Sequence, residues 1–290
     1  MRLRFGYGTN GFAHHRLTDA LTVIADLGYQ GVALTLDGVH LDPYAPDLAT
    51  RVASTARLLD RLGLSVVIST GARYLLDPWY RYAPTLLDDG RDRRVEFLCR
   101  AVDIAADLGA GAVSFWAGVR PSTVEYGQAW DRLVAGCAAV CDHAARAGVP
   151  LGFEPEPGML VETLDQWQVL HDRLDGAPSF GLTLDIGHCQ AVEPDPVPDC
   201  VKRAGPSLAT VQIDDMRRGI HEHLEFGQGE IDFPPVLDAI AATGFRGLVS
   251  VELPRHSHAA PDVAARSLLF LRAAEHRAAY DGPPAGGPTS

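Results

Sequence analysis

The chain has 290 residues, 47% of them hydrophobic and 21% charged, with a formal net charge of −12. No stretch approaches the roughly 18 apolar residues that a membrane-spanning helix needs, and the negative charge disfavours nucleic acid, so we expect neither as a partner. The start MRLRF has no secretory pattern, and the five cysteines form no CxxC pair. These features predict a cytoplasmic protein with reduced thiols.

Short apolar runs alternate with amphipathic stretches along the chain. Five junctions repeat one pattern, in which a helical stretch ends near a glycine and a strand-like run follows. In chain order, strands are expected at residues 3–7, within the junctions 25–34, 60–68, 106–115 and 145–153, at 180–184 and 208–213, and within the junction 242–251. Helical patterns cover residues 47–62, 93–108 and 165–174.

This alternation of strands and helices predicts a parallel sheet with right-handed crossovers, and eight such units close into a barrel. An open doubly wound sheet is the competing architecture, but no GxGxxG segment follows an early strand. We therefore predict a single-domain α/β fold, a (β/α)₈ TIM barrel, over residues 1–280. The remaining residues 281–290, DGPPAGGPTS, have the composition of a disordered tail.

Polar side chains follow the last four expected strands at the point where each strand ends. The segments LGFEPEPG, LTLDIGHC, TVQIDD and VSVELP place Glu154, Asp185, Gln212 and Glu252 at equivalent positions. In an α/β barrel these positions face the catalytic mouth. Three carboxylates that converge there repel one another unless a cation lies between them. The sequence therefore predicts one divalent metal ion, with oxygen ligands that favour Mn²⁺ or Mg²⁺ and also allow Co²⁺ or Zn²⁺.

Three further residues near strand ends are candidate substrate contacts. Arg73 follows the third strand and can hold a phosphate or carboxylate, or form an ordinary surface ion pair. Trp116 follows the fourth strand and can form an apolar wall under a sugar ring, or pack within the barrel. His188 lies three residues after Asp185 in the segment DIGH, where it can contact a substrate or serve as a core histidine.

Together these segments resemble the xylose-isomerase-like TIM barrel superfamily, in particular its branch of sugar phosphate isomerases and epimerases. The resemblance covers residues 1–275 and rests on GFEPEPG, TLDIGH, VQIDD, HEHLEFGQGEIDF and VSVELP. It implies that Glu154 and Glu252 act as acid and base on opposite faces of a substrate carbon. It also implies that His188 and Arg217 hold substrate oxygens.

The chain departs from the usual pattern of that branch at two positions. Gln212 stands where the epimerases usually have histidine, and a glutamine there is similar to the dehydroshikimate dehydratase branch. Ala33 stands where many members have a glutamate. We therefore expect Asp37 and His40, which follow the second strand, to supply polar groups to the substrate instead.

The segment HEH, residues 221–223, is a candidate for further binding. His221 and His223 alternate as in an extended segment, so both can reach the same ligand. The AP endonuclease branch of the superfamily has a similar segment that serves additional zinc ions. Ala33 and Ser69 stand where that branch has further ligands, so we expect one metal ion and treat both histidines as substrate contacts.

These observations lead to three interpretations. The first is a divalent-metal-dependent isomerase or epimerase of a sugar, keto-sugar or cyclitol, which transfers a proton through a metal-stabilised enediolate. The second is a dehydratase or lyase of a keto cyclitol or a dehydroshikimate-like acid, and the third is a non-catalytic sugar-binding pseudoenzyme. We expect the first, with a small-molecule sugar or cyclitol as partner; the resemblance is also compatible with a homo-oligomer.

Overall fold

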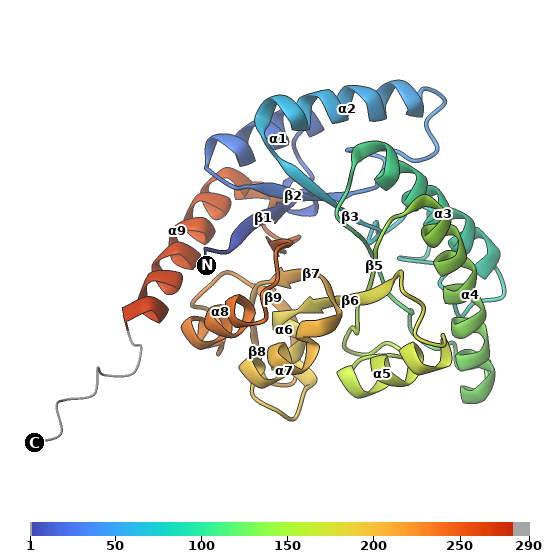
Figure 1. Ribbon diagram of the computed structural model, residues 1–290. Helices are drawn as coiled ribbons and strands as arrows, with labels where there is room; N and C mark the ends of the chain where they lie inside the picture. The colour runs from blue at the N-terminus through green and yellow to red at the C-terminus, as the bar shows by residue number, and fades with distance from the viewer. Residues whose placement is uncertain (1, 281–290) are drawn as a thin grey trace, which may run out of the picture.

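Eight parallel strands close into one barrel in the computed structural model, which describes residues 2–280 (Figure 1). Around the barrel the order is β1-β10-β7-β6-β5-β4-β3-β2, so each strand pairs with its neighbours among the eight barrel strands in chain order. The barrel strands are β1 Arg4–Gly8, β2 Gly31–Thr35, β3 Ser65–Ser69, β4 Val113–Phe115, β5 Leu151–Phe153, β6 Phe180–Asp185, β7 Leu208–Ile213 and β10 Leu248–Val251. The predicted (β/α)₈ fold and its eight strands are confirmed.

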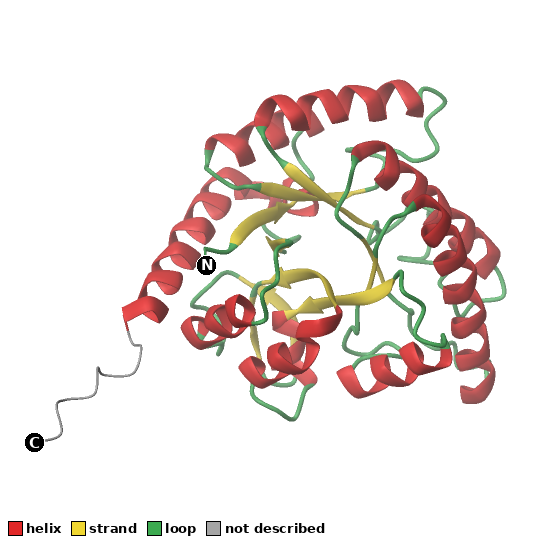
Figure 2. Ribbon diagram, in the orientation of Figure 1, coloured by secondary structure: helices red, strands yellow, loops and turns green. Residues whose placement is uncertain are grey.

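The helices surround the barrel on its outside, as Figure 2 shows in red around the yellow strands. They are α1 Leu17–Asp26, α2 Leu48–Leu62, α3 Arg91–Leu108, α4 Tyr126–Ala147, α5 Leu164–Arg173, α6 Ile186–Val192, α7 Val197–Ala204, α8 Phe233–Ala242 and α9 Ala260–Tyr280, with the short 3₁₀ helices η1 Thr9–Phe12, η2 Gly205–Ser207 and η3 Ser257–Ala259. No helix within residues 2–280 is long and apolar enough to cross a membrane. The predicted disordered tail, residues 281–290, lies outside the described residues.

The helix ends follow the glycine pattern of the sequence. Gly63, Gly109 and Gly148 end α2, α3 and α4 with φ angles of 66°, 62° and 68°, which is the left-handed region that glycine adopts at little cost. Each glycine therefore stops its helix and returns the chain to the barrel as β3, β4 or β5.

Small and hydroxyl-bearing residues fill the barrel interior below the mouth. A Cβ atom on Gly152 would lie 2.3 Å from the hydroxyl oxygen of Thr183, so only glycine fits at that point of β5. The Thr183 hydroxyl lies 3.0 Å from the Ser114 hydroxyl, and Ser114 donates to Glu154 Oε2 at 3.3 Å. The interior of the barrel thus supports a carboxylate at its mouth through two hydroxyl groups.

Two features near the mouth were not predicted. An antiparallel hairpin of β8 Asp215–Arg217 and β9 Ile220–Leu224 follows β7, where the sequence analysis expected an extended segment only for residues 221–223. Asp215 fixes the chain after this hairpin, because its Oδ2 accepts the backbone N–H groups of Gly227 and Gly229 at 2.8 Å each. The second feature is the long segment 70–90 between β3 and α3, which carries the exposed Trp79.

Candidate active site

The four strand-end residues predicted as metal ligands lie on four consecutive strands of the barrel. Glu154 follows β5, Asp185 ends β6, Gln212 is in β7 and Glu252 follows β10. Asp185 and Gln212 are partners in the β6–β7 register, and Gln212 is the partner of Ser250, two residues before Glu252. Glu154, Asp185 and Gln212 are only 6%, 2% and 6% exposed. The structure therefore brings the set together in a largely buried position.

Hydrogen bonds hold the two glutamates differently. Both oxygens of Glu252 accept a bond from an amide: Asn10 Nδ2 donates to Oε1 at 2.9 Å, and Gln212 Nε2 donates to Oε2. Glu154 accepts from the Ser114 hydroxyl, and its backbone N–H donates to the Phe115 carbonyl at 2.8 Å. Glu252 is thus fixed at both oxygens by side chains, while Glu154 is fixed by its backbone and one hydroxyl.

Two oxygen atoms of this set have no hydrogen-bond partner although they are buried. They are Asp185 Oδ2 and Gln212 Oε1, on side chains that are neighbours across the β6–β7 register. A buried oxygen without a partner is costly, and a cation would satisfy both. Oxygen donors of this kind suit hard divalent ions. The residues present therefore fit the predicted metal ion.

The carboxyl groups of the site have shifted pKa values. Burial, and then the charge of Glu252, raise the pKa of Glu154 well above its ordinary value. Burial also raises the pKa of Glu252 itself. For Asp185, burial acts to raise the pKa, but the three neighbouring histidines and the backbone N–H of His188 lower it, and the net pKa is below the ordinary value. Carboxylates crowded in this way favour a bound proton or a bound cation.

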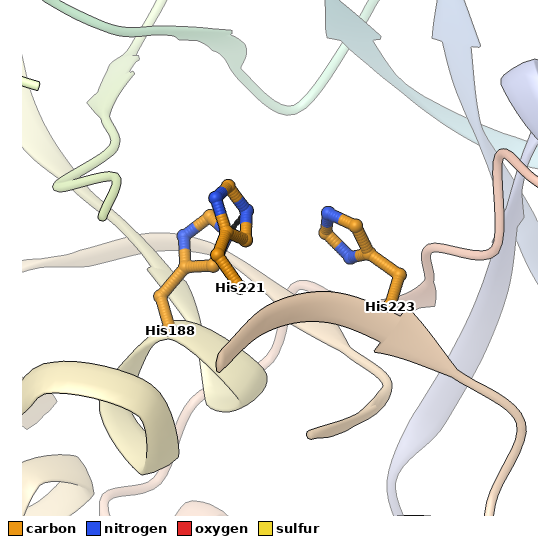
Figure 3. Close-up of side chains that lie close together, drawn as sticks. All are labelled: His188, His221 and His223. Carbon is orange, nitrogen blue, oxygen red and sulfur yellow. Dashed lines mark hydrogen bonds between the residues drawn. The ribbon is translucent and has the colours of Figure 1, made fainter. Parts of the chain in front are cut away.

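Three histidines, His188, His221 and His223, lie close together (Figure 3), and His188 Nδ1 is 3.6 Å from Glu154 Oε1. His188 belongs to α6, and its backbone N–H donates to Asp185 Oδ1 at 2.9 Å. His221 and His223 project from β9, two residues apart, and one ring nitrogen of each lies within 4.8 Å of a ring nitrogen of His188. His223 Nδ1 is bonded to Asp214, and this carboxylate raises the pKa of His223 to about 10 although burial acts to lower it.

These groups face a cavity of about 1270 Å³ at the mouth of the barrel. Its wall includes most of the residues that the sequence singled out, namely Glu154, Gln212, Glu252, His188, His221, His223, Arg73, Trp116 and Asp37. Asp185 does not line this cavity and is the most buried of the four expected metal ligands, as a ligand beneath an ion would be. The cavity exceeds the roughly 300 Å³ of a small ligand pocket, so a sugar-sized molecule fits.

Two expected substrate contacts do not reach the cavity. His40 has a fully buried side chain, with Nε2 3.3 Å from the Phe12 carbonyl oxygen and Nδ1 3.4 Å from Asp37 Oδ2. Arg217 is exposed on β8, and its guanidinium donates to the Gln228 carbonyl at 2.9 Å. His40 therefore joins the loop after β2 to η1, and Arg217 joins the hairpin to the loop after β9. Neither is positioned to hold a substrate oxygen.

Three residues of the site were missed in the sequence. Asn10 lies two residues after the end of β1, in η1, and lines the cavity, so the strand-end rule could have found it. Glu156 is in the same EPEPG segment as Glu154 and also lines the cavity; burial, and then the charge of Glu252, raise its pKa to about 8. Asp214, in the segment TVQIDD, was not among the predicted site residues, and no sequence signal links it to His223 nine residues later.

Fold and site together define a (β/α)₈ barrel with a carboxylate-rich centre at the carboxyl ends of its strands. The model of the xylose isomerase-like TIM barrel family matches residues 21–274. The chain belongs to this family.

Similar proteins include enzymes with named activities. The chain is 29% identical over 221 residues to L-ribulose 3-epimerase of Mesorhizobium japonicum, covering 73% of this chain and 68% of that protein. It is 30% identical over 203 residues to 3-dehydroshikimate dehydratase of Pseudomonas putida, covering 62% of this chain and 31% of that protein. A solved structure of an L-ribulose 3-epimerase shares the fold, with a TM-score of 0.74 at 21% identity over 98% of this chain and 100% of that one.

Proposed function

We propose that the chain is a divalent-metal-dependent isomerase or epimerase of a sugar, keto-sugar or cyclitol. The observation that carries the proposal is the order of the site residues around the barrel. Glu252, Gln212, Asp185 and Glu154 lie on the consecutive strands β10, β7, β6 and β5, so two glutamates flank an aspartate and an amide whose free oxygens fit a cation. The similarity to L-ribulose 3-epimerase supports the same class of reaction.

The chemistry follows from the two glutamates. Glu154, Asp185, Gln212 and Glu252 would hold a divalent cation, which when bound would polarise a substrate carbonyl and so acidify the neighbouring C–H bond. One glutamate takes that proton, and the pair of electrons moves into an enediolate. Return of a proton by the opposite glutamate inverts the carbon, whereas return to the adjacent carbon isomerises the sugar. Inversion needs the two glutamates to reach the substrate from opposite faces, as their places after β5 and β10 allow, whereas one glutamate suffices for isomerisation.

The other half of the cavity is suited to hold the substrate. Trp116 is 7% exposed and packs edge-to-face against Tyr82 at 5.2 Å between ring centroids, and both rings line the cavity. Arg73 and Arg81 also line it, and neither forms an ion pair within the described residues. Both guanidinium groups lie near Tyr82, with Arg81 Cζ 5.0 Å from the centre of its ring. An apolar wall beside guanidinium groups without a carboxylate partner suits a sugar ring with a carboxylate or phosphate substituent.

A second candidate is a dehydratase of a keto cyclitol or a dehydroshikimate-like acid. Gln212 in place of the usual histidine favours it, as does the similarity to 3-dehydroshikimate dehydratase. The enediolate is common to both reactions, and loss of a β-hydroxyl group instead of reprotonation makes the difference. The products separate the two candidates, since a dehydratase forms an absorbing enone and an epimerase does not.

The test is a reaction panel with the chelator-treated protein, reconstituted in turn with Mn²⁺, Mg²⁺, Co²⁺ and Zn²⁺. Ketoses, their phosphates and inososes are offered as substrates, and products are followed by NMR and ultraviolet absorption. We expect a metal-dependent change of configuration or of carbonyl position in at least one sugar or cyclitol. A protein that takes up no metal and converts no compound of the panel would be a binding protein, and the proposal would then be wrong.

A further inference from the structure

The cavity at the barrel mouth extends well beyond the acids. Part of its wall comes from the loop after β2, from the segment after β3 and from α3, and includes Val39, Asp42, Tyr44, Tyr74, Arg93 and Glu96. We call this part of the cavity the outer arm. In the barrel, β2 and β3 lie across from β6 and β7, which carry Asp185 and Gln212 (Figure 1). The outer arm therefore lies on the far side of the mouth from these two expected metal ligands.

The volume of the cavity is larger than a single sugar needs. Pockets that bind drug-sized ligands measure roughly 300–1,000 Å³, whereas this cavity measures about 1270 Å³. A monosaccharide is smaller than such ligands, so a single sugar bound at the acids leaves the outer arm empty. A substrate that fills the cavity carries a further group at the end that faces β2 and β3.

Exposed apolar side chains on the cavity wall are confined to the outer arm, among the side chains that the structure describes. Val39, Tyr44 and Tyr74 are 57%, 41% and 57% exposed, and all three line the cavity. Apolar surface that stays exposed within a concave site marks a place where a ligand binds. The exposed rings therefore indicate that the outer arm is covered when the site is occupied.

The ring of Tyr44 is held in one orientation. Its hydroxyl donates to Glu96 Oε2 at 3.0 Å, and Arg100 Cζ lies over one face of the ring, 4.9 Å from its centre. Arg100 also donates to the Pro43 carbonyl at 3.2 Å, which fixes the loop next to Tyr44. Burial, and then the bond to Glu96, raise the pKa of Tyr44 to about 12, so its hydroxyl remains a donor to Glu96. The exposed remainder of the ring is the part that a ligand can cover.

The charged groups of the outer arm already have hydrogen-bond partners in the protein. Asp42 accepts a backbone N–H of its own loop at 2.8 Å, and Glu96 accepts two bonds from Arg100 at 2.8 and 3.1 Å. Arg93 donates to the Leu76 carbonyl at 2.6 Å. The outer arm thus presents mainly ring and aliphatic surface to a ligand. Such a surface suits an uncharged ring, because the apolar face of a ring packs well on tyrosine.

We propose that the outer arm is a binding subsite for a second, uncharged ring, so that the substrate is a keto-sugar joined to that ring through a glycosidic bond. The first ring lies at the acids with its carbonyl free, and the second ring packs on Tyr44 and Tyr74. The second ring is a pyranose or an aromatic ring, since both present an apolar face. This inference rests on the proposed function, because it names the substrate class of the same site.

The test compares matched ligands that differ in the second ring. Isomaltulose is fructose with a glucose unit on its C6 oxygen, and phenyl β-D-glucoside carries an aromatic ring where methyl β-D-glucoside has a methyl group. Dissociation constants of isomaltulose, fructose and the two glucosides are measured by calorimetry on the full-length protein, with and without Mn²⁺. We expect the second ring to raise the affinity about 5- to 10-fold in at least one of the two pairs. Saturation-transfer NMR should then show contact of the protein with that ring.

Substitutions in the outer arm locate the contact. Tyr44→Ala and Tyr74→Ala should each lower the affinity ratio within the pair about 3-fold or more, whereas Tyr44→Phe, which keeps the ring, should retain most of it. Tyr80→Ala is the matched control and should leave the ratio unchanged, because Tyr80 is 70% exposed on the 70–90 loop and does not line the cavity. Thermal unfolding of each variant identifies any loss of affinity that is due to loss of folding. Tyr74→Ala decides the outcome if Tyr44→Ala does not fold.

The outcomes separate this inference from the proposed function, because affinity is measured without turnover. A gain in affinity that depends on Tyr44 and Tyr74 supports the subsite, even in a protein that converts no sugar and so contradicts the proposed function. Conversion of a single-ring sugar, together with equal affinity within both pairs, supports the proposed function and overturns the subsite. A gain that both alanine variants retain, or no binding of any of the four compounds, would also show that the inference is wrong.

Discussion

The two halves of the barrel mouth are built in different ways. On the side of β5, β6, β7 and β10, charged groups sit directly at or next to the strand ends, and the barrel register fixes their spacing. On the side of β2, β3 and β4, the cavity wall comes from loops, above all from residues 70–90, with aromatic and arginine side chains. In the proposed function, the first half performs the chemistry and the second half selects the substrate, and we call them the chemical half and the loop half.

In the second half, hydrogen bonds and ring contacts of one buried arginine, Arg94, fix the loop that forms the cavity wall. Arg94 is 3% exposed, and its guanidinium donates to the carbonyl groups of Tyr82 at 2.6 Å and Pro84 at 2.9 Å. The same guanidinium lies 5.0 Å from the centre of the Trp116 ring, whose edge meets Tyr82. One arginine from α3 thus holds both the loop and the aromatic wall. In the first half the supports are single hydrogen bonds to the carboxylates, such as those from Asn10 to Glu252 and from Ser114 to Glu154.

The largest loss of turnover is expected from a substitution in the chemical half, at Glu252. Glu252→Gln removes one of the two proposed acid–base groups while keeping the size of the side chain, so we expect turnover to fall by about 10² to 10⁴. Metal uptake should persist more weakly. Glu162→Gln is the control, a change of the same type on the loop after β5, where Glu162 does not line the cavity. Equal turnover in Glu252→Gln and the wild-type protein would remove Glu252 from the mechanism.

A smaller loss of turnover is expected when a residue that holds Glu252 in place, Asn10, is substituted. Asn10 donates to Glu252 Oε1 at 2.9 Å, so Asn10→Ala leaves the carboxylate without one of its two amide partners. We expect a roughly 10- to 100-fold loss of turnover, as for other residues that orient a metal ligand. Metal content and turnover are measured together. A loss as large as that of Glu252→Gln would mean that Asn10 contacts the substrate itself.

Changes in the loop half should affect binding more than chemistry. Trp116→Ala removes an apolar wall, and we expect KM to rise about 10-fold, for roughly 1.4 kcal/mol of lost contact, with little change in kcat. Trp79→Ala is the matched control, because Trp79 is 84% exposed on the 70–90 loop and does not line the cavity. Steady-state kinetics of both variants make the comparison. If Trp116→Ala lowered kcat and left KM unchanged, the division between the two halves would fail.

The last prediction concerns folding stability and not turnover: the stability of the metal-free protein should depend on pH through Glu156. Burial, and then Glu252, raise the pKa of Glu156 from its ordinary 4.5 to about 8, so the folded chain keeps a proton that the unfolded chain has lost. The metal-free protein should therefore lose stability as the pH rises from about 5 to about 8, and the loss should level off above that pH. Glu156→Gln cannot ionise, so its Tm should fall less over the same range. The Tm of both proteins is measured by calorimetry in a chelator at each pH. If the Tm of the wild-type protein and that of Glu156→Gln changed equally with pH, the raised pKa would be contradicted.

The sequence predicted the chemical half better than the loop half, and the reason is physical. Strand periodicity and the rule that strand ends face the mouth were sufficient to locate Glu154, Asp185, Gln212 and Glu252. The resemblance implied Arg217 as a substrate contact, and His40 was expected because it follows the second strand. The β8–β9 hairpin and the contact of His40 with the Phe12 carbonyl take both side chains away from the cavity. Contacts between distant loops, such as Asp214 with His223, depend on tertiary packing that no local pattern records.

The central claim is that Glu154 and Glu252 exchange a substrate proton with solvent at a metal-dependent site. It is tested most directly by incubating the reconstituted protein in D₂O with a converted sugar and measuring deuterium at each carbon by NMR. We predict deuterium at one carbon next to the carbonyl, none after chelation, and none in Glu154→Gln or Glu252→Gln. Conversion of the sugar without solvent deuterium, or undiminished exchange in both variants, would contradict the account.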